Sequence, residues 1–237
     1  KTVVDSVSFE IPKGKVISMI GPNGAGKSTV LNIISRLIAR DSGLVDFDGR
    51  DIGKWKSKEL AKRLAILTQS NNIQMKLTVR ELVTFGRFPY SGSHLNEEDQ
   101  RIIDKAIAYM ELEPFQDRFI DELSGGQLQR VCIARAVACK PEVILFDEAI
   151  SSLDAHTQVQ VMDLLRDLKE KLGLTYVFIT HDLTSITYLC DDVLFLYQGR
   201  VTEYLPVSRI SETKDEYARR LLESIVVFDT ETSEVDV

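Results

Sequence analysis

The sequence predicts an α/β protein with a parallel sheet and a helical insert, and three observations support this expectation. Apolar runs typical of strands buried on both faces occupy residues 16–20, 143–146 and 176–180. Amphipathic helical periodicity lies between these runs, as in alternating β and α units. From about residue 71 to 138 the pattern is helical and more charged. We therefore expect a sheet whose strands are separated in the sequence by a block of helices.

The remaining elements are predicted from local patterns in chain order. Val3, Val7 and Phe9 alternate with polar residues and predict strands that lead to a turn at 12–14. Thr78, with Glu81 three residues later, forms a capping box that begins a helix. Other helices are predicted over 29–38, 57–63, 96–110, 127–139 and 159–172, and other strands over 44–47, 64–67, 193–197 and 200–202. The acidic end of the chain, from Asp229, is expected to be frayed.

The composition is that of a globular protein, with one large domain or two small ones in 237 residues. The chain has 29 basic and 36 acidic residues, and the net charge of −7 argues against a general nucleic-acid-binding function. No apolar run approaches the ~18 residues of a membrane span. The first residues lack the apolar stretch of a secretory signal, and the three cysteines show no metal-type spacing. We therefore expect reduced thiols and a cytosolic location.

A glycine-rich segment between the first apolar run and the next helix has the pattern G-x-x-x-x-G-K-[ST]. It consists of Gly21, Pro22, Asn23, Gly24, Ala25, Gly26, Lys27, Ser28 and Thr29. Glycines let backbone N–H groups converge on a phosphate, and the next helix directs the positive end of its dipole toward it. Lys27 would add a charge at the β- and γ-phosphates, and Ser28 would hold Mg²⁺. The alternative, a glycine-rich turn with a surface lysine, is disfavoured by the flanking strand and helix.

Two adjacent carboxylates, Asp147 and Glu148, follow the apolar run at 143–146. Ligands of parallel α/β sheets bind at this C-terminal edge of the strands. We expect Asp147 to coordinate Mg²⁺ through its water shell and Glu148 to polarise the attacking water. The alternative is a solvated acidic strand end, which the phosphate loop upstream disfavours.

A second anion site is predicted immediately before the helix at 127–139. Ser124 is a suitable N-cap, Gly125 and Gly126 give a backbone nest, and Gln127 lies in the first turn. One nucleotide rarely needs two phosphate sites on one chain. We therefore expect this nest to close on the γ-phosphate held by a second copy of the chain.

Together these motifs resemble the ATP-binding subunit of ATP-binding cassette (ABC) transporters, and the resemblance extends over nearly the whole chain. The segment 123–127, Leu-Ser-Gly-Gly-Gln, matches the specific signature of that family without departure. The resemblance implies that Gln69 senses Mg²⁺ and the membrane partner, that His181 holds the γ-phosphate and the attacking water, and that Asp154 acts across the dimer. It makes Lys27, Gln69, Glu148 and His181 the expected catalytic residues, and Ser28, Gln69 and Asp147 the expected metal ligands.

The resemblance also implies the architecture and the partners. The fold class would be a P-loop NTPase with a RecA-like core, an antiparallel β region and an inserted α-helical subdomain. Within a single ABC ATPase domain, 1–237, the core would cover 1–70 and 139–205, the helical subdomain 71–138, and a C-terminal helix with an acidic tail 206–237. ATP and Mg²⁺ would be the cofactors. A homodimer or paired ATPase subunit would contact an integral membrane permease near Gln69 and Phe88, on the inner face of the cell membrane.

Three features depart from the family pattern. Ala149 replaces the proline that follows the catalytic glutamate in most members, as in the peptide and nickel importers. The aromatic residue that stacks on adenine would lie before Lys1, so the mode of base binding stays open. Residues 1–123, above all Phe-Gly-Arg-Phe-Pro-Tyr at 85–90, resemble iron–siderophore importer ATPases, whereas residues 124–237 resemble peptide and nickel importer ATPases. Either a hybrid of two sequences or a natural family intermediate would explain this.

The main expectation is an ATP hydrolase that drives import of an iron–siderophore or of a peptide or metal solute. One alternative is a soluble ABC ATPase of translation or DNA repair, which the single phosphate loop and the short helical insert disfavour. The other is a folded scaffold with little or no ATPase or transport activity. Residues 85–90 have two interpretations as well, a groove for a helix of the permease or a helix end with packed aromatic residues.

Overall fold

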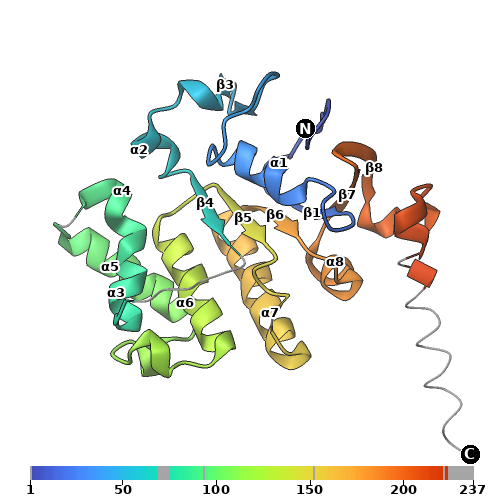
Figure 1. Cartoon of the computed structure of the whole chain (residues 1–237). Coiled ribbons are helices and arrows are strands. Elements are labelled where there is room, and N and C mark those ends of the chain that lie inside the picture. Colours follow the sequence, from blue (N-terminus) through green and yellow to red (C-terminus); the bar gives the residue numbers. More distant parts are fainter. Residues whose placement is uncertain (1, 69–74, 93, 152, 221, 224–237) are drawn as a thin grey trace, which may run out of the picture.

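A six-stranded sheet forms the centre of the molecule in the computed structural model, which describes residues 2–68, 75–92, 94–151, 153–220 and 222–223 (Figure 1). Its strands, in spatial order, are β4 (Leu64–Leu67), β5 (Val143–Asp147), β6 (Thr175–Ile179), β1 (Val16–Ile20), β7 (Asp192–Tyr197) and β8 (Arg200–Pro206). The first five are parallel, and β8 pairs antiparallel with β7. The buried strands predicted from the sequence are confirmed, and β1, which precedes the phosphate loop, lies inside the sheet.

Helices cover both faces of this sheet (Figure 1). One face carries α1 (Lys27–Ile34), and the other carries α6 (Gly125–Ala138), α7 (Ala155–Leu172) and α8 (Leu183–Leu189). Successive strand side chains point to opposite faces. Ile17 and Met19 of β1 accordingly pack with residues of α1, whereas Phe146 and Tyr176 pack among residues of α6 and α7. Because both faces are buried, the inner strands β1, β5, β6 and β7 are mostly apolar and show no polar alternation, whereas the edge strand β8 alternates exposed and half-buried residues.

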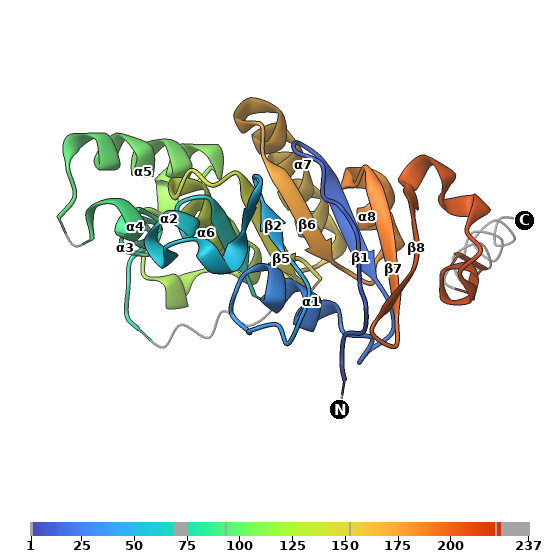
Figure 2. The same cartoon turned by 90° about the horizontal axis from the view of Figure 1, so that it is seen from above.

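The block predicted to be helical lies beside the β4 edge of the sheet (Figure 2). It contains α3 (Val79–Thr84), η2 (Phe85–Arg87), α4 (Phe88–Ser91), α5 (Glu97–Tyr109), η3 (Glu113–Phe115) and η4 (Ile120–Glu122), followed by α6. Thr78 begins α3 with the predicted capping box to Glu81, and Asn96 begins α5 with a second one to Asp99. Helices α3, α5 and α6 share one apolar core with the face of the sheet that carries α6 and α7, so this block is continuous with the strands.

Smaller elements complete the chain before β4 and after β8. A two-stranded antiparallel sheet of β2 (Asp46–Phe47) and β3 (Arg50–Asp51), then η1 (Ile52–Lys54) and α2 (Ser57–Leu60), connects α1 to β4. After β8 come η5 (Val207–Glu212) and a helical segment from residue 216. The predicted frayed tail from Asp229 lies outside the described residues. Within the described segments, no helix is both long and apolar enough to cross a membrane.

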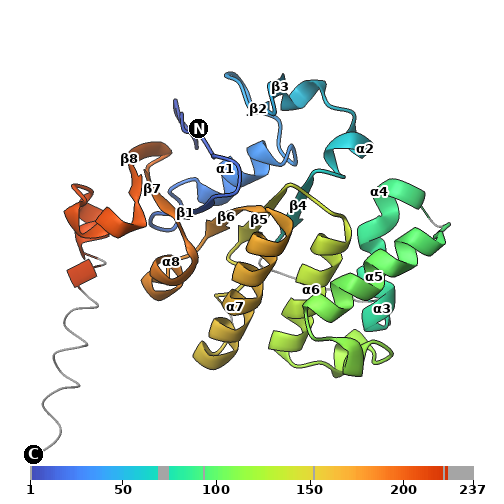
Figure 3. The same cartoon turned by 180° about the vertical axis from the view of Figure 1, so that it is seen from behind.

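The turn between β7 and β8 touches two other parts of the chain. Gln198 and Gly199 have φ values of 47° and 78°, as a type I′ hairpin turn requires. The Gly199 N–H donates to the Ala25 carbonyl of the phosphate loop at 2.9 Å, and the Gly199 carbonyl accepts from the Asp5 N–H at 2.8 Å. The N-terminal segment and the phosphate loop therefore meet at this hairpin (Figure 3).

Two local predictions are wrong, and one helix was missed. Residues 2–15 contain no strand, because the Asp5–Gly199 bond joins the segment to β8's turn at one point and no ladder continues from it, although Val7 and Phe9 pack on the core. Helix α1 ends at Ile34 instead of residue 38, since Arg36 adopts φ 60° and donates to the Trp55 carbonyl at 2.6 Å. Helix α8 was not predicted, because its many β-branched residues favour a strand.

Candidate nucleotide-binding site

The phosphate loop is held tightly at both of its ends. It leaves β1 at Gly21, where a side-chain Cβ would stand 2.0 Å from the Leu196 carbonyl oxygen, so only glycine fits against β7. It enters α1 through Gly26, whose φ of 102° is strained for any residue with a Cβ. The loop thus presents the N-terminus of α1, with its unpaired backbone N–H groups, at the C-terminal edge of the sheet.

Lys27, the first residue of α1, is buried beneath the loop, with 6% of its surface exposed. Its ammonium donates to the Gly21 carbonyl at 2.7 Å and to the Pro22 carbonyl at 3.1 Å. Burial lowers the pKa of Lys27, and the nearby charges of Glu148 and Asp147 oppose that shift. A desolvated cation inside a ring of backbone dipoles attracts a phosphate more strongly than a hydrated surface lysine does.

Ser28 and Asp147 meet from opposite elements of the site. The Ser28 hydroxyl on α1 donates to Asp147 Oδ1 at the end of β5 at 3.0 Å. Burial raises the pKa of Asp147, and the Glu148 charge raises it further, while the Ser28 hydrogen bond and Lys27 lower it. This carboxylate therefore lacks full charge compensation from the protein. A hydroxyl and a carboxylate oxygen side by side fit Mg²⁺, which takes one or two protein oxygens beside water and phosphate.

Glu148 and His181 form the other contact of the site. His181 Nε2 lies 3.0 Å from Glu148 Oε1, and the two side chains are 35% and 21% exposed. Glu148 adopts φ 50°, a left-handed conformation that costs about 1–3 kcal/mol in a residue with a side chain. Its N–H donates to the Ile179 carbonyl at 3.1 Å, and its carbonyl accepts from the Ser151 hydroxyl at 2.8 Å. The strained backbone is thus fixed on both sides, and the carboxylate is held beside the histidine.

The predicted second anion site is a helix N-terminus made by local contacts. Ser124 and Gln127 form a capping box, in which the Gln127 N–H donates to the Ser124 hydroxyl at 3.3 Å. A Cβ on Gly126 would stand 2.3 Å from Thr157 Cγ2 in the first turn of α7, whereas a Cβ on Gly125 would have no neighbour within 4 Å. Packing within the chain therefore explains the glycine at 126 and does not explain the one at 125.

Asp154 is the N-cap of α7, and its carboxylate accepts from the Thr157 N–H at 3.0 Å. The starts of α6 and α7 lie together, at the end of the molecule away from α1 (Figures 1 and 3). No hydrogen bond or ion pair between described residues joins Asp154 or the segment 124–127 to the phosphate loop. The chain thus brings Lys27, Ser28, Asp147, Glu148 and His181 together, whereas the segment 124–127 and Asp154 make their hydrogen bonds within the first turns of α6 and α7. Gln69 and Ser152 lie outside the described residues.

Sequence analysis missed two residues that support His181. Asp182 follows it directly and is the N-cap of α8, accepting from the Thr184 and Ser185 N–H groups. Gln158 of α7 donates to the same carboxylate at 3.0 Å. The Asp182 cap could have been predicted, because an aspartate stands directly before Leu-Thr-Ser. Gln158 lies 24 residues away in the sequence, and no local pattern marks its contact with Asp182.

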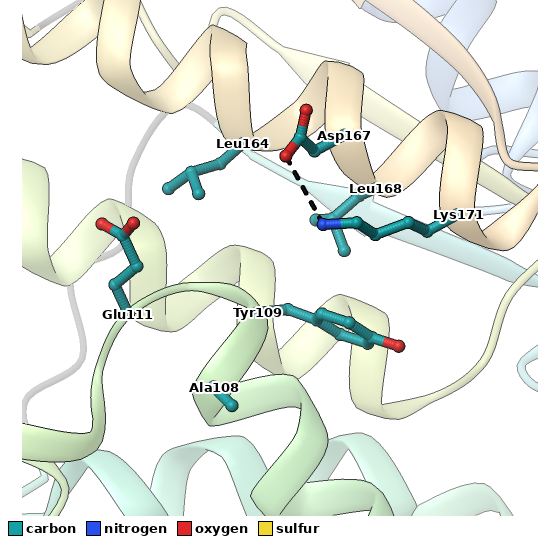
Figure 4. A pocket seen from close by; sticks show the side chains of 7 residues that line it. All are labelled: Ala108, Tyr109, Glu111, Leu164, Asp167, Leu168 and Lys171. Carbon is teal, nitrogen blue, oxygen red and sulfur yellow. Dashed lines mark hydrogen bonds and ion pairs between the residues drawn. The ribbon is translucent and has the colours of Figure 1, made fainter.

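A cleft of about 180 Å³ lies elsewhere, between the end of α5 and the outer face of α7 (Figure 4). Its lining residues are Ala108, Tyr109, Glu111, Leu164, Asp167, Leu168 and Lys171. Two of its charged groups pair with each other, with Lys171 Nζ 3.4 Å from Asp167 Oδ2. None of the predicted site residues lines this cleft, so it is separate from the nucleotide site.

A phosphate cradle that shares one sheet edge with two carboxylates is the arrangement of a P-loop nucleoside triphosphatase. The chain belongs to the ABC transporter family, whose model matches residues 4–151. It is 47% identical over 213 residues to the petrobactin import ATP-binding protein YclP of Bacillus subtilis, covering 90% of this chain and 84% of that protein. It is 37% identical over 223 residues to BOV_A0347 of Brucella ovis, an ATP-binding protein assigned to peptide import, covering 92% of this chain and 68% of that protein.

The solved structures agree with this assignment. The dimeric bacterial ABC transporter cassette MJ0796 is 34% identical and superposes with a TM-score of 0.76, covering 86% of this chain and 90% of that one. A dimer of the same cassette in a post-hydrolysis state, with ADP and phosphate bound, gives a TM-score of 0.75. The predicted fold class is confirmed, and the chain is an ATP-binding and ATP-hydrolysing ABC cassette.

Both sequence relatives bear on the two resemblances within the chain. Alignments of 213 and 223 residues in a chain of 237 must each cross the junction between residues 123 and 124. Siderophore-type and peptide-type likeness therefore both extend through the junction. The hybrid origin stays a hypothesis beside the natural intermediate.

Proposed function

We propose that this chain hydrolyses ATP to drive an ABC importer for an iron–siderophore solute. The observation that carries the proposal is its 47% identity to the petrobactin import ATP-binding protein of Bacillus subtilis over 90% of the chain. A peptide or metal solute is the second candidate, supported by the 37% identity to a protein assigned to peptide import.

Two copies would sandwich two ATP molecules in the working protein. Each site would combine the phosphate loop 21–29, Asp147, Glu148 and His181 of one copy with the 124–127 segment and Asp154 of the other. The open position at Gly125 supports this pairing, because nothing in its own chain approaches it. Each helix N-terminus would then face the same triphosphate from opposite sides.

Within such a site, each side chain would have a distinct task. Lys27 would neutralise the β- and γ-phosphates, and Ser28 with Asp147 would hold Mg²⁺, which supplies further charge neutralisation. Glu148 would accept a hydrogen bond from the attacking water and orient it in line with the γ-phosphate. His181 would hold the γ-phosphate and this water. Gln69 would complete the metal site. ATP would close the dimer because it binds the closed state better, and hydrolysis would remove that preference.

The permease would contact the turn at 85–90, on the inner face of the cell membrane. Phe85 is 45% and Phe88 63% exposed, while Arg87 between them is 4% exposed and buried. The segment 85–90 therefore exposes the side chains of Phe85 and Phe88 and buries the guanidinium of Arg87. Because aromatic residues are enriched at protein interfaces, the exposure of Phe85 and Phe88 supports a docking role for these two residues.

Substitution of Glu148 by glutamine tests the hydrolytic part of the proposal. The amide keeps the shape, but it is uncharged and far less basic than a carboxylate, so it cannot polarise the attacking water; ATP should bind and a dimer should accumulate without turnover. Gel filtration with Mg-ATP and a phosphate-release assay would measure both, with Lys27→Ala as the control that should neither bind ATP tightly nor dimerise. Unchanged steady-state hydrolysis would remove Glu148 from its proposed role.

The solute is tested by exchanging ATP-binding subunits in cells. This chain would replace the ATP-binding subunit of an iron–siderophore importer and, separately, that of a peptide importer. We expect uptake of radioactive ferric siderophore to be restored and to be lost again with Lys27→Ala. Restored peptide uptake alone would favour the second candidate.

A further inference from the structure

We propose that Gln158 is a positioning residue that ties the loop of His181 to the first turn of α7. The inference rests on the roles proposed for His181 and Asp154. Gln158 neither touches the phosphate loop nor belongs to any motif of the sequence. Through it, α7 would change the orientation of His181 when the second copy docks on the first turn of α7.

The bond itself joins two helices. Gln158 Nε2 donates to Asp182 Oδ2 at 3.0 Å and lies 2.6 Å from the Ser185 hydroxyl. The Asp182 carboxylate also accepts from the N–H groups of Thr184 and Ser185 and from the Ser185 hydroxyl. Among the described donors to this carboxylate, only Gln158 comes from outside α8.

The charge on Asp182 makes this bond effective. Burial raises the pKa of the carboxyl, but hydrogen bonds from Ser185 and from the backbone of Thr184 outweigh burial, so the pKa lies below its usual value. The group is therefore a carboxylate, and an amide N–H that donates to a carboxylate forms a stronger bond than one between neutral groups. His181 precedes Asp182 directly and shares its backbone, so a shift of the cap moves the histidine.

The first turn of α7 has contacts in three directions. Asp154 caps it and is proposed to face the second copy. Thr157, whose N–H donates to Asp154, packs closely on Gly126, where a Cβ would stand 2.3 Å from its Cγ2. Gln158, one turn beyond Asp154, reaches the His181 loop. The same turn thus touches the 124–127 segment, the expected dimer contact and the histidine loop.

Helix α7 is a long helix anchored in the core. It has 18 residues and buries Val161, Met162, Leu165 and Leu168 in the main core. Its N-terminus is also connected to Glu148 through a short turn, where the Ser151 hydroxyl donates to the Glu148 carbonyl at 2.8 Å. A displacement of Asp154 by the second copy would therefore reach Glu148 through the chain and His181 through Gln158.

Gln158→Ala in the full-length chain tests the inference. We expect kcat for ATP hydrolysis to fall about tenfold, because His181 loses its orientation, with KM and binding of a fluorescent ATP analogue unchanged. Gln158→Glu keeps the length of the side chain but sets a second carboxylate against Asp182, and it should lose as much. Gln160→Ala is the matched control: this exposed residue on the same helix contacts Arg130 and should leave kcat and the melting temperature unchanged.

A double-mutant cycle separates positioning from structure. If Gln158 acts through His181, Gln158→Ala should have no further effect on the residual hydrolysis of His181→Ala. Native kcat in both Gln158 variants, full additivity with His181→Ala, or a parallel fall of melting temperature, kcat and nucleotide binding would each overturn the inference. If His181→Ala and Glu148→Gln themselves keep native hydrolysis, the proposed function fails first, so the two failures are distinguishable.

Discussion

The two ends of the nucleotide site are built in different ways. At the phosphate end, the defining contacts join residues far apart in the sequence: Ser28 to Asp147 across 119 positions and Glu148 to His181 across 33. At the 124–127 end, the defining contact is a capping box between residues three positions apart. The first end therefore exists only when the sheet has formed, whereas the second is a property of one helix turn.

The two ends also contribute different chemical groups to the site. The phosphate end carries a buried cation, a carboxylate with incomplete charge compensation and a strained glutamate, all held by tertiary structure. The other end offers backbone N–H groups and one glycine that its own chain leaves uncovered. We therefore expect the first end to hold an anion by itself and the second to be completed only by an anion that the other copy holds.

The largest effect is expected from Gly21→Ala at the phosphate end. The new methyl group would stand 2.0 Å from the Leu196 carbonyl oxygen, and neither backbone can yield without breaking the β1–β7 pairing. We expect the free energy of unfolding in urea to fall by about 3 kcal/mol or more, with loss of nucleotide binding. A variant that unfolds and binds ATP like the native chain would contradict the close approach.

A pair of neighbouring substitutions at the other end should separate stability from activity. Gly126→Ala gains about 1 kcal/mol of helix propensity but overpacks Thr157 by about 1–3 kcal/mol, so the unfolding free energy should fall slightly. Gly125→Ala meets no neighbour and also replaces a helical glycine, so the unfolding free energy should stay unchanged or rise by up to about 1 kcal/mol, while ATP hydrolysis falls about tenfold because the methyl group blocks the helix N-terminus. Urea denaturation and phosphate release would measure the two effects.

The pair also has a clear contrary outcome. Native hydrolysis by Gly125→Ala would mean that nothing approaches this position in the working dimer. The segment 124–127 of the second copy would then not complete the nucleotide site.

A smaller effect is expected from Ser124→Ala, which removes the cap of α6. Loss of an N-cap costs about 1 kcal/mol, or roughly 2–4 °C in melting temperature for a chain of this size. Thr78→Ala removes the same kind of cap from α3 and serves as the control, with a similar melting shift and no direct loss of hydrolysis. Calorimetry and phosphate release would show whether Ser124 contributes more than a cap.

The smallest effect concerns Asp147 and the pH. Its pKa is raised in the folded chain by burial, so the folded carboxylate is less favourable than the unfolded one at neutral pH. Asp147→Asn should therefore stabilise the nucleotide-free chain slightly at pH 7. The gain should fade as the pH falls through the raised pKa toward the ordinary value of 3.8, where the native residue is also neutral. Thermal melts from pH 7 to 4 would test the sign, and a gain that grows on acidification would refute it.

The parts of the molecule that were predictable from the sequence are the local ones. The phosphate loop, the capping boxes at Thr78 and Ser124 and the buried strands each depend on residues within a few positions of one another. The contacts of Ser28 with Asp147 and of Gln158 with Asp182 depend on strand order, which a single sequence does not encode locally. The wrong strands near Val7 have the same cause, since alternation makes a strand only where a partner strand continues beside it.

The β7–β8 hairpin has a consequence for protein engineering. A two-residue turn at the end of an exposed hairpin is where one would ordinarily insert a tag, open a circular permutant or expect a harmless polymorphism. Here Gly199 donates to Ala25 in the phosphate loop, accepts from Asp5 and lies so close to Val3 that a Cβ would stand 2.2 Å from its carbonyl oxygen. The turn supports the phosphate loop through this bond, and we expect an insertion there to weaken ATP binding.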